Sequence, residues 1–164
     1  MKQGKHQKSE DFCGLKVLVK TFKYRKAVFI VTYYHSNKNK ILYLILKRKL
    51  HWKGWEFPKG GINNSENLIN AVKRELKEET GQTSLKIKNH HFSGKYKYPQ
   101  AYPDRTGIIG QTYNLFSAEV KNKKIILDKK EHTGYKWLSF DKAIKKLTYD
   151  NQKKCLRKVN KELG

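Results

Sequence analysis

The sequence predicts an α/β domain in which a mixed β-sheet is flanked by helices. Three observations support this class: short apolar runs recur along the chain, one helical segment interrupts them, and the C-terminal residues have helical periodicity. Strands interleaved with few helices are typical of a mixed sheet covered by helical layers. The 164 residues fit one domain, which we place at 21–164, after a basic N-terminal arm at 1–20 that could add an edge strand.

The individual elements follow from apolar spacing and from the turn signals between the runs. The turn-like segment HSNKNK separates two strand-like runs, and the loop WKGWEFPKGG precedes the first helix. Ser65 is the expected N-cap of that helix and Gly81 its expected C-terminal stop. We expect strands at 16–22, 27–34, 41–47, 85–92, 111–120, 124–127 and 135–138, and helices at 66–80, 141–147 and 151–163.

The formal net charge of +23 indicates an anionic partner, such as nucleic acid or a polyphosphate. However, the positive side chains are mostly lysines scattered along the chain, with few arginines, whereas sequence-reading contacts to nucleic acid favour arginine. Solvated lysines explain the charge equally well. Charge therefore supports an anionic substrate without identifying it.

The remaining composition favours a cytoplasmic protein. No apolar run approaches membrane-spanning length, and the N-terminal residues lack the apolar stretch of a signal peptide. Cys13 and Cys155 are isolated, so we expect two free thiols, with Cys155 on a buried helix face. The histidines have no zinc-ligand spacing.

The first predicted helix ends with three glutamates, Glu75, Glu78 and Glu79. At about 100° per residue two of these side chains lie at the border of the apolar face or within it, and Lys73 and Lys77 point to the far side. The three carboxylates repel each other at i,i+3 and i,i+4 spacing and lie where the helix dipole disfavours anions. A hard divalent cation, Mg²⁺ or Mn²⁺, would relieve this repulsion. The alternative is a solvated charge cluster.

The segment GGINNSENLINAVKRELKEETGQ resembles the Nudix box, G-x5-E-x7-R-E-U-x-E-E-x-G-U, in which U is aliphatic. Gln82 replaces the usual aliphatic residue, and Asn64 and Ser65 replace a frequent Pro-Gly pair. The resemblance implies the Nudix fold, an α/β/α sandwich, and Mg²⁺-dependent hydrolysis of a nucleoside diphosphate linked to another group. The matching residues are Gly60, Glu66, Arg74, Glu75, Leu76, Glu78, Glu79 and Gly81.

The similarity extends beyond the box, over roughly 24–163, and resembles one branch of the family. GWEFPKGGI, YKYP and IGQTYNLF resemble segments of the branch that holds diadenosine tetraphosphate hydrolases and bacterial RNA 5′-pyrophosphohydrolases. EHTGYKWLSFDKAI resembles the diadenosine tetraphosphate enzymes more closely. This resemblance therefore implies hydrolysis of a dinucleoside polyphosphate, diadenosine tetraphosphate to ATP and AMP.

Three alternatives remain open. GGINNSE, the IGQ segment and the positive charge favour an RNA 5′-pyrophosphohydrolase. A non-catalytic Nudix-fold RNA-binding module would be expected to have degraded box glutamates, whereas here all are intact. Sanitation of oxidised nucleotides shares the box but not the flanking segments.

The resemblance also assigns roles to residues of the box and of a later loop. It implies that Mg²⁺, or Mn²⁺ as a substitute, is held by Glu75, Glu78, Glu79 and Glu131. It implies a catalytic group of Glu78, Glu75, Glu131 and Arg74, in which Arg74 orients a box glutamate and the general base is left open. Glu66 is expected to organise the loop before the helix.

The expected substrate contacts combine cations, glycines and aromatic rings. Glycine lets the chain approach an anion closely, so Lys59, Gly60 and Gly61 are candidate phosphate contacts. Aromatic side chains can stack on a nucleobase. The full set is Lys59, Gly60, Gly61, Arg48, Tyr149, Tyr98 and Tyr113, with Arg25, Lys95, Lys97 and Tyr96 as weaker candidates. The implied partners are a nucleotide substrate or an RNA 5′ end, with no membrane and no obligate protein partner.

Overall fold

A computed structural model describes residues 22–36 and 40–164. The N-terminal arm and Cys13 lie outside these residues, and so does the predicted strand at 16–22 except for its last residue. The described elements are β1 (Lys23–His35), β2 (Ile41–Arg48), β3 (Gly54–Glu56), β4 (Lys59–Gly61), α1 (Leu68–Thr80), β5 (Ser84–Lys97), η1 (Pro103–Arg105), β6 (Ile108–Val120), β7 (His132–Leu138), α2 (Phe140–Lys146) and α3 (Asp150–Leu163).

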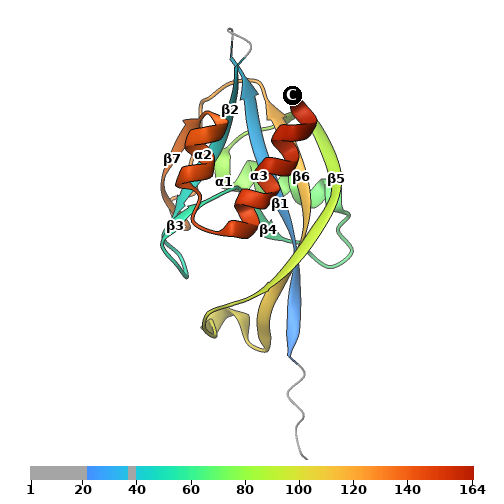
Figure 1. Cartoon of the computed structure of the whole chain (residues 1–164). Helices are drawn as coiled ribbons and strands as arrows, with labels where there is room; N and C mark the ends of the chain where they lie inside the picture. The colour runs from blue at the N-terminus through green and yellow to red at the C-terminus, as the bar shows by residue number, and fades with distance from the viewer. Residues whose placement is uncertain (1–21, 37–39) are drawn as a thin grey trace, which may run out of the picture.

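The strands form one mixed sheet with helices on both faces, which confirms the predicted fold class. The main strand order is β3-β2-β1-β6-β5, with β4 also pairing with β1 and β7 with β2. The β1–β6 pair is parallel, with Ala27 opposite Tyr113, and the other strand pairs in the described part of the chain are antiparallel. Figure 1 shows α2 and α3 in front of the sheet and α1 behind it.

Two hydrophobic cores hold these three layers together. Phe29 and Val31 of β1 point into the core under α2 and α3, where Cys155 is a buried free thiol. Val28 and Ile30 point into the core under α1. Because β1 is covered on both faces, its central residues form an almost continuous apolar run instead of alternating with polar ones.

The segment expected to be a loop before α1 contains two short strands. Gly54–Glu56 pairs with β2, and Lys59–Gly61 pairs with β1. The predicted strand at 124–127 is wrong, because those residues form an irregular segment beside the end of α1, with the Ile126 amide donating to the Thr80 carbonyl at 2.9 Å. The strands β5 and β6 are longer than predicted. Their distal ends extend beyond the helices and are joined by the segment that contains η1 (Figure 1).

The first helix begins later than predicted. Asn67, not Ser65, is its N-cap, and Asn67 Oδ1 accepts from the Asn70 amide at 2.8 Å. Ser65 instead has a left-handed backbone, with φ of 63°. Gly81 ends the helix in a left-handed conformation, as predicted. No helix in the described part of the chain is long and apolar enough to span a membrane.

Replacing the N-cap should weaken α1. We expect Asn67→Ala to lower the free energy of unfolding by about 1 kcal/mol, because the Asn70 amide loses its acceptor. Urea denaturation followed by circular dichroism measures this change. Asn64→Ala is the control, since Asn64 is exposed in the preceding loop. Equal effects of the two substitutions would contradict the assigned cap.

Candidate active site

The three glutamates of α1 lie at the centre of the candidate site. Glu75 is 8% and Glu79 3% exposed, because both lie on the face that packs with Val72 and Leu76 against the sheet. The Glu78 side chain is 57% exposed. The helical face that buries the apolar stripe therefore also carries two carboxylates into the interior.

Arg74 connects these carboxylates to the loop before the helix. Its guanidinium donates to Glu75 at 2.7 Å, to Glu78 at 3.2 Å and to Glu66 at 2.8 Å. A further bond reaches the Gly61 carbonyl of β4 at 2.7 Å. Glu66 also accepts from the Asn63 amide, so it joins the loop to the helix in the way expected of a loop-organising residue. Arg74 thus fixes the helix against β4.

Arg48 forms a second cluster of charges, at the end of β2. Its Nη1 lies 3.2 Å from Glu56 and 3.8 Å from Glu79, and it also donates to Glu131. Glu56 is fully buried and forms a 3.1 Å ion pair with Lys59. Glu56 lies on the short strand β3, inside the GWEFPKGGI segment, and was not among the predicted site residues.

Burial and charge change the proton affinities of these groups. Burial raises the pKa of Glu79 well above its ordinary value, and the neighbouring carboxylate of Glu56 raises it further. The pKa of Glu75 is also raised, mainly by burial. For Glu56, burial alone would raise the pKa, but Lys59, His132 and Arg48 outweigh it and hold the pKa below its ordinary value. Burial and neighbouring carboxylates therefore disfavour the ionised forms of Glu75 and Glu79.

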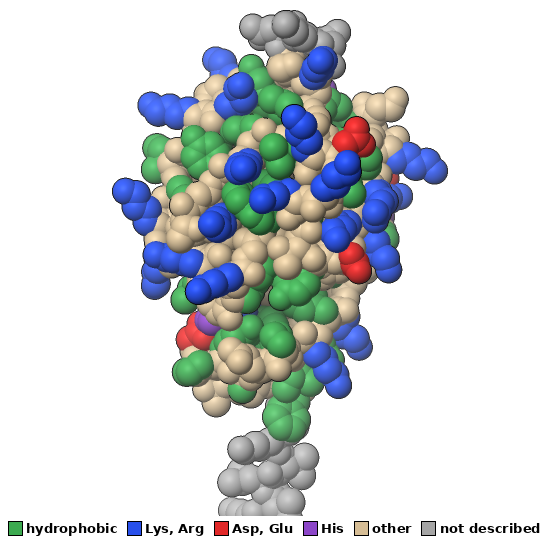
Figure 2. All heavy atoms as spheres, turned by 60° about the vertical axis from the view of Figure 1, so that its left-hand side comes forward, with side chains coloured by type: hydrophobic (Ala, Val, Ile, Leu, Met, Phe, Trp, Pro, Cys, Tyr) green, Lys and Arg blue, Asp and Glu red, His purple; other side chains and the backbone are tan. Residues whose placement is uncertain are grey.

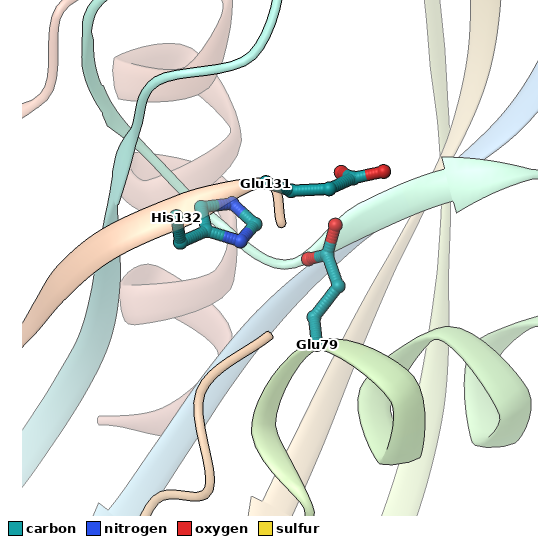
Figure 3. A group of neighbouring side chains, drawn as sticks. All are labelled: Glu79, Glu131 and His132. Atoms are coloured by element: carbon teal, nitrogen blue, oxygen red, sulfur yellow. The ribbon is translucent and has the colours of Figure 1, made fainter. Parts of the chain in front are cut away.

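A divalent cation fits this arrangement. One ligand atom each from Glu79, Glu131 and His132 lie within 4.8 Å of one another. Figure 3 shows the Glu79 carboxylate directed toward Glu131 and the His132 ring. The Nδ1 atom of His132 is buried and has no hydrogen-bond partner among the described residues. Carboxylate oxygens and imidazole nitrogen are ordinary ligands for divalent metals.

The two glycines of β4 make room for charged side chains. A Cβ on Gly60 would lie 1.8 Å from the Glu75 carboxyl carbon, and a Cβ on Gly61 would lie 2.2 Å from the Arg25 guanidinium. Any side chain at these positions would displace Glu75 or Arg25. Packing against the Glu75 and Arg25 side chains thus explains why both positions are glycine.

An aromatic cavity of about 450 Å³ lies beside the charged cluster. Trp52 and Tyr149 lie at 4.7 Å between ring centroids, and the Tyr149 residue is 43% exposed. On another wall, Tyr98 and Tyr102 lie at 5.2 Å, with the Arg105 guanidinium over both rings. Flat rings and a guanidinium are the groups on which nucleobases stack.

The aromatic cavity adjoins a second, charged cavity. The second has a volume of about 240 Å³ and is lined by Glu75, Glu78, Glu131 and Arg74, among others. Both cavities share Arg48, Lys59 and Arg105 as lining residues. A ligand could therefore occupy the aromatic cavity and extend past these three cations to the carboxylates.

Most of the candidate substrate residues line one of these cavities. Arg25 and Gly60 line the charged one, and Tyr96, Lys97 and Tyr98 line the aromatic one. The nomination of Tyr113 needs correction. It is 5% exposed and stacked at 4.0 Å on Phe29 inside the core, and it lines neither cavity.

Several residues that line the aromatic cavity were not predicted. His51, Trp52 and Tyr102 lie in loops and Arg105 ends the short helix η1, so no helical or strand spacing marked them. The only signal available was their residue type. His51 has a φ of 68° and pairs with Asp104 at 3.0 Å, and this pair joins two loops at the cavity.

A family model described as "NUDIX domain" matches residues 23–159. An RNA pyrophosphohydrolase of Actinobacillus pleuropneumoniae is 30% identical over 138 residues, which are 77% of this chain and 66% of that protein. An RNA pyrophosphohydrolase of Histophilus somni is 32% identical over 121 residues, 67% of this chain and 62% of that protein. The chain thus matches somewhat less than two thirds of the length of these relatives.

The fold of this chain is also similar to that of solved structures. A binary complex of the C. elegans Ap4A hydrolase superposes with a TM-score of 0.66 at 27% identity, covering 85% of this chain and 97% of that chain. The NUDIX domain of Shewanella oneidensis NrtR, complexed with ADP ribose, superposes with a TM-score of 0.70, covering 91% and 95% of the two chains. Its identity is 16%, so it supports the fold alone.

Adding a methyl group at Gly60 should disturb cation binding. We expect Gly60→Ala to weaken Mn²⁺ affinity by about tenfold or more, since the new Cβ must displace the Glu75 carboxylate by more than an ångström. Isothermal titration calorimetry measures the affinity. Gly134→Ala is the control, because a Cβ there would meet nothing within 4 Å. If Gly60→Ala binds Mn²⁺ like the wild type, Glu75 is not a ligand.

Removing the buried negative charge at Glu56 should destabilise the protein. We expect Glu56→Gln to lower the free energy of unfolding by about 3 kcal/mol, because Lys59 and Arg48 lose a buried partner. Chemical denaturation without metal ions measures the loss. Glu78→Gln removes an exposed carboxylate of the same site and should cost far less. A similar loss of stability in both variants would show that burial of the Glu56 ion pairs does not determine the change in the free energy of unfolding.

Proposed function

Because the chain belongs to the NUDIX family, we propose that it is a divalent-metal-dependent hydrolase that cleaves a phosphoanhydride bond at the 5′ end of RNA. The curated relatives named RNA pyrophosphohydrolase support this substrate class. Every glutamate of the box is intact, which supports an enzyme over a non-catalytic binding module.

The observation that carries the proposal is the pair of adjoining cavities. An aromatic cavity suits the 5′ nucleoside, and the neighbouring charged cavity suits its phosphates. Lys59 and Arg48 line both, so their positive charges face the place where the phosphate chain would pass. Trp52, Tyr149 and Tyr98 line the aromatic cavity and provide the proposed stacking surfaces.

The proposed metal ligands are Glu75, Glu78, Glu79 and Glu131, with His132 adjacent. Mg²⁺ is the proposed ion and Mn²⁺ its substitute, since both accept carboxylate oxygens. When bound, the ion neutralises phosphate oxygens and lowers the pKa of a coordinated water.

The chain's own residues position the reacting groups. Arg74 holds the Glu75 and Glu78 side chains in fixed orientations through its hydrogen bonds. Glu78 is the proposed general base, because it is the most exposed of the box glutamates of α1 and lines the charged cavity. Glu131 approaches from the loop opposite α1 and completes the carboxylate group.

Hydrolysis of a dinucleoside polyphosphate is the second candidate. The EHTGYKWL segment and the 27% identity to the C. elegans Ap4A hydrolase favour it. We place RNA first because the curated relatives carry that name, which reverses the order favoured by the sequence. Both candidates use the same two cavities and the same bond chemistry.

One kinetic experiment tests the function and ranks the candidates. We expect a higher kcat/KM with 5′-triphosphate RNA than with diadenosine tetraphosphate in the presence of Mg²⁺, by about tenfold or more. Glu78→Gln should lower kcat at least about a hundredfold, since a general base is lost. Lys73→Gln, an exposed change on α1, is the matched control. A preference for diadenosine tetraphosphate would replace RNA with the second candidate, and full activity of Glu78→Gln would contradict its role.

A further inference from the structure

One face of the sheet carries exposed lysines around a tryptophan, outside both cavities. Trp55 of β3 lies opposite Lys47 of β2, and Lys47 lies opposite Gly134 of β7. Residues paired across neighbouring strands point to the same face of a sheet. Lys136 lies two residues further along β7, opposite Ile45 of the core under α2 and α3, so it shares that face. Three adjacent strands thus present one continuous surface.

The last residue of α2 completes this surface. The Lys146 and Lys136 ammonium groups lie over the Trp55 ring, at 5.1 Å and 5.6 Å from its centroid. A Cβ on Gly134 would meet no atom within 4 Å, so the surface is open there. We call the four residues Lys47, Trp55, Lys136 and Lys146 the lysine platform.

The platform is positively charged and lacks acidic neighbours. Among the described residues, none of its three lysines lies within 4.0 Å of a carboxylate, whereas Lys88 and Lys158 both pair with Glu162. Figure 2 shows the side of the molecule that carries β7 and α2, where Lys and Arg side chains clearly outnumber Asp and Glu. The charges of the three platform lysines are therefore not neutralised by an ion pair within the described part of the chain.

The platform is continuous with the aromatic cavity. The Trp55 amide donates to Thr148 Oγ1 at 2.8 Å, and the Thr148 amide donates to the Trp55 carbonyl at 3.1 Å. The next residue, Tyr149, lines the cavity. Trp55 of the platform is thus hydrogen-bonded to the residue that precedes Tyr149 of the cavity wall.

We propose that the lysine platform binds the phosphate backbone of the RNA segment that follows the 5′ nucleotide, an assignment that rests on the proposed function. Lysine is a point charge that binds phosphate without reading sequence, which suits an RNA body of variable sequence. The Trp55 ring holds two of the ammonium groups in place, so less side-chain entropy is lost on binding.

The first experiment measures binding without hydrolysis. A 5′-hydroxyl RNA of about twelve nucleotides is titrated by fluorescence anisotropy over a range of salt concentrations. In Lys47→Gln/Lys136→Gln/Lys146→Gln we expect roughly tenfold or greater loss of affinity, and the slope of log Kd against log salt to fall by about 2, since each phosphate contact contributes ~0.7. The control, Lys73→Gln/Lys86→Gln/Lys121→Gln, removes the same charge from exposed positions elsewhere and should bind like the wild type. Thermal unfolding confirms that both variants fold.

The second experiment measures turnover of short and long substrates. The platform variant should lose the gain in kcat/KM that a long 5′-triphosphate RNA has over a 5′-triphosphate dinucleotide, and should cleave the dinucleotide like the wild type. If no RNA is hydrolysed but the platform variant still loses RNA binding, the proposed function fails while the platform assignment stands. Equal loss of binding in the two triple variants, no loss in either, or equally tight binding of polyglutamate would overturn the platform as an RNA surface.

Discussion

The whole site depends on burying several carboxylates close to one another. Glu56, Glu75 and Glu79 are 0%, 8% and 3% exposed, and Arg48 lies within ion-pair distance of Glu56, Glu79 and Glu131. Removing one ion from water costs several kcal/mol, so these groups persist only where cations and hydrogen bonds offset that cost. Arg48, Arg74 and Lys59 supply the offset from three different elements. The interaction of these three cations with the carboxylates therefore joins β2, β4 and α1 around one centre.

This electrostatic requirement explains features that propensity alone does not. Glycine is unfavourable in strands, yet β4 contains two, because the Glu75 and Arg25 side chains occupy the space where each Cβ would lie. The strand brings the Gly61 carbonyl to Arg74 and the Lys59 amide to Glu79. Helix α1 is thus fixed by polar bonds at its exposed edge and by apolar packing beneath it. A displacement of β4 or of α1 would therefore move the carboxylates.

The sequence predicted the elements that have strong periodicity and missed those defined by distant partners. The apolar run around Val28–Val31, helix α1 and the glutamates at its end are local patterns, so spacing and charge placement were enough. Glu56 and Trp52 gave no such pattern, because their roles come from Lys59, His132 and Tyr149, which only the fold brings near. The prediction for Tyr113 was wrong for a related reason. A tyrosine on a strand can face a cavity or the core, and stacking on Phe29, which the fold brings near, places Tyr113 in the core. The predicted N-cap was Ser65 and the observed one is Asn67. Either side chain could accept the hydrogen bond, but Ser65 has a left-handed backbone and Asn67 accepts from the Asn70 amide.

The distribution of charge in space carries information that the net charge of +23 does not. The carboxylates lie inside the site, the two arginines and Lys59 surround them, and exposed lysines without a carboxylate within ion-pair distance in the described residues begin just outside the aromatic cavity. An anion is repelled by the carboxylates and attracted by the arginines and lysines around them. This arrangement of charge would steer an approaching polyphosphate toward the site. Under the proposed function, a divalent cation held by the carboxylates would offset their remaining repulsion of phosphate. Lysines that are scattered in the sequence are thus brought together on one surface when the strands β3, β2 and β7 pair.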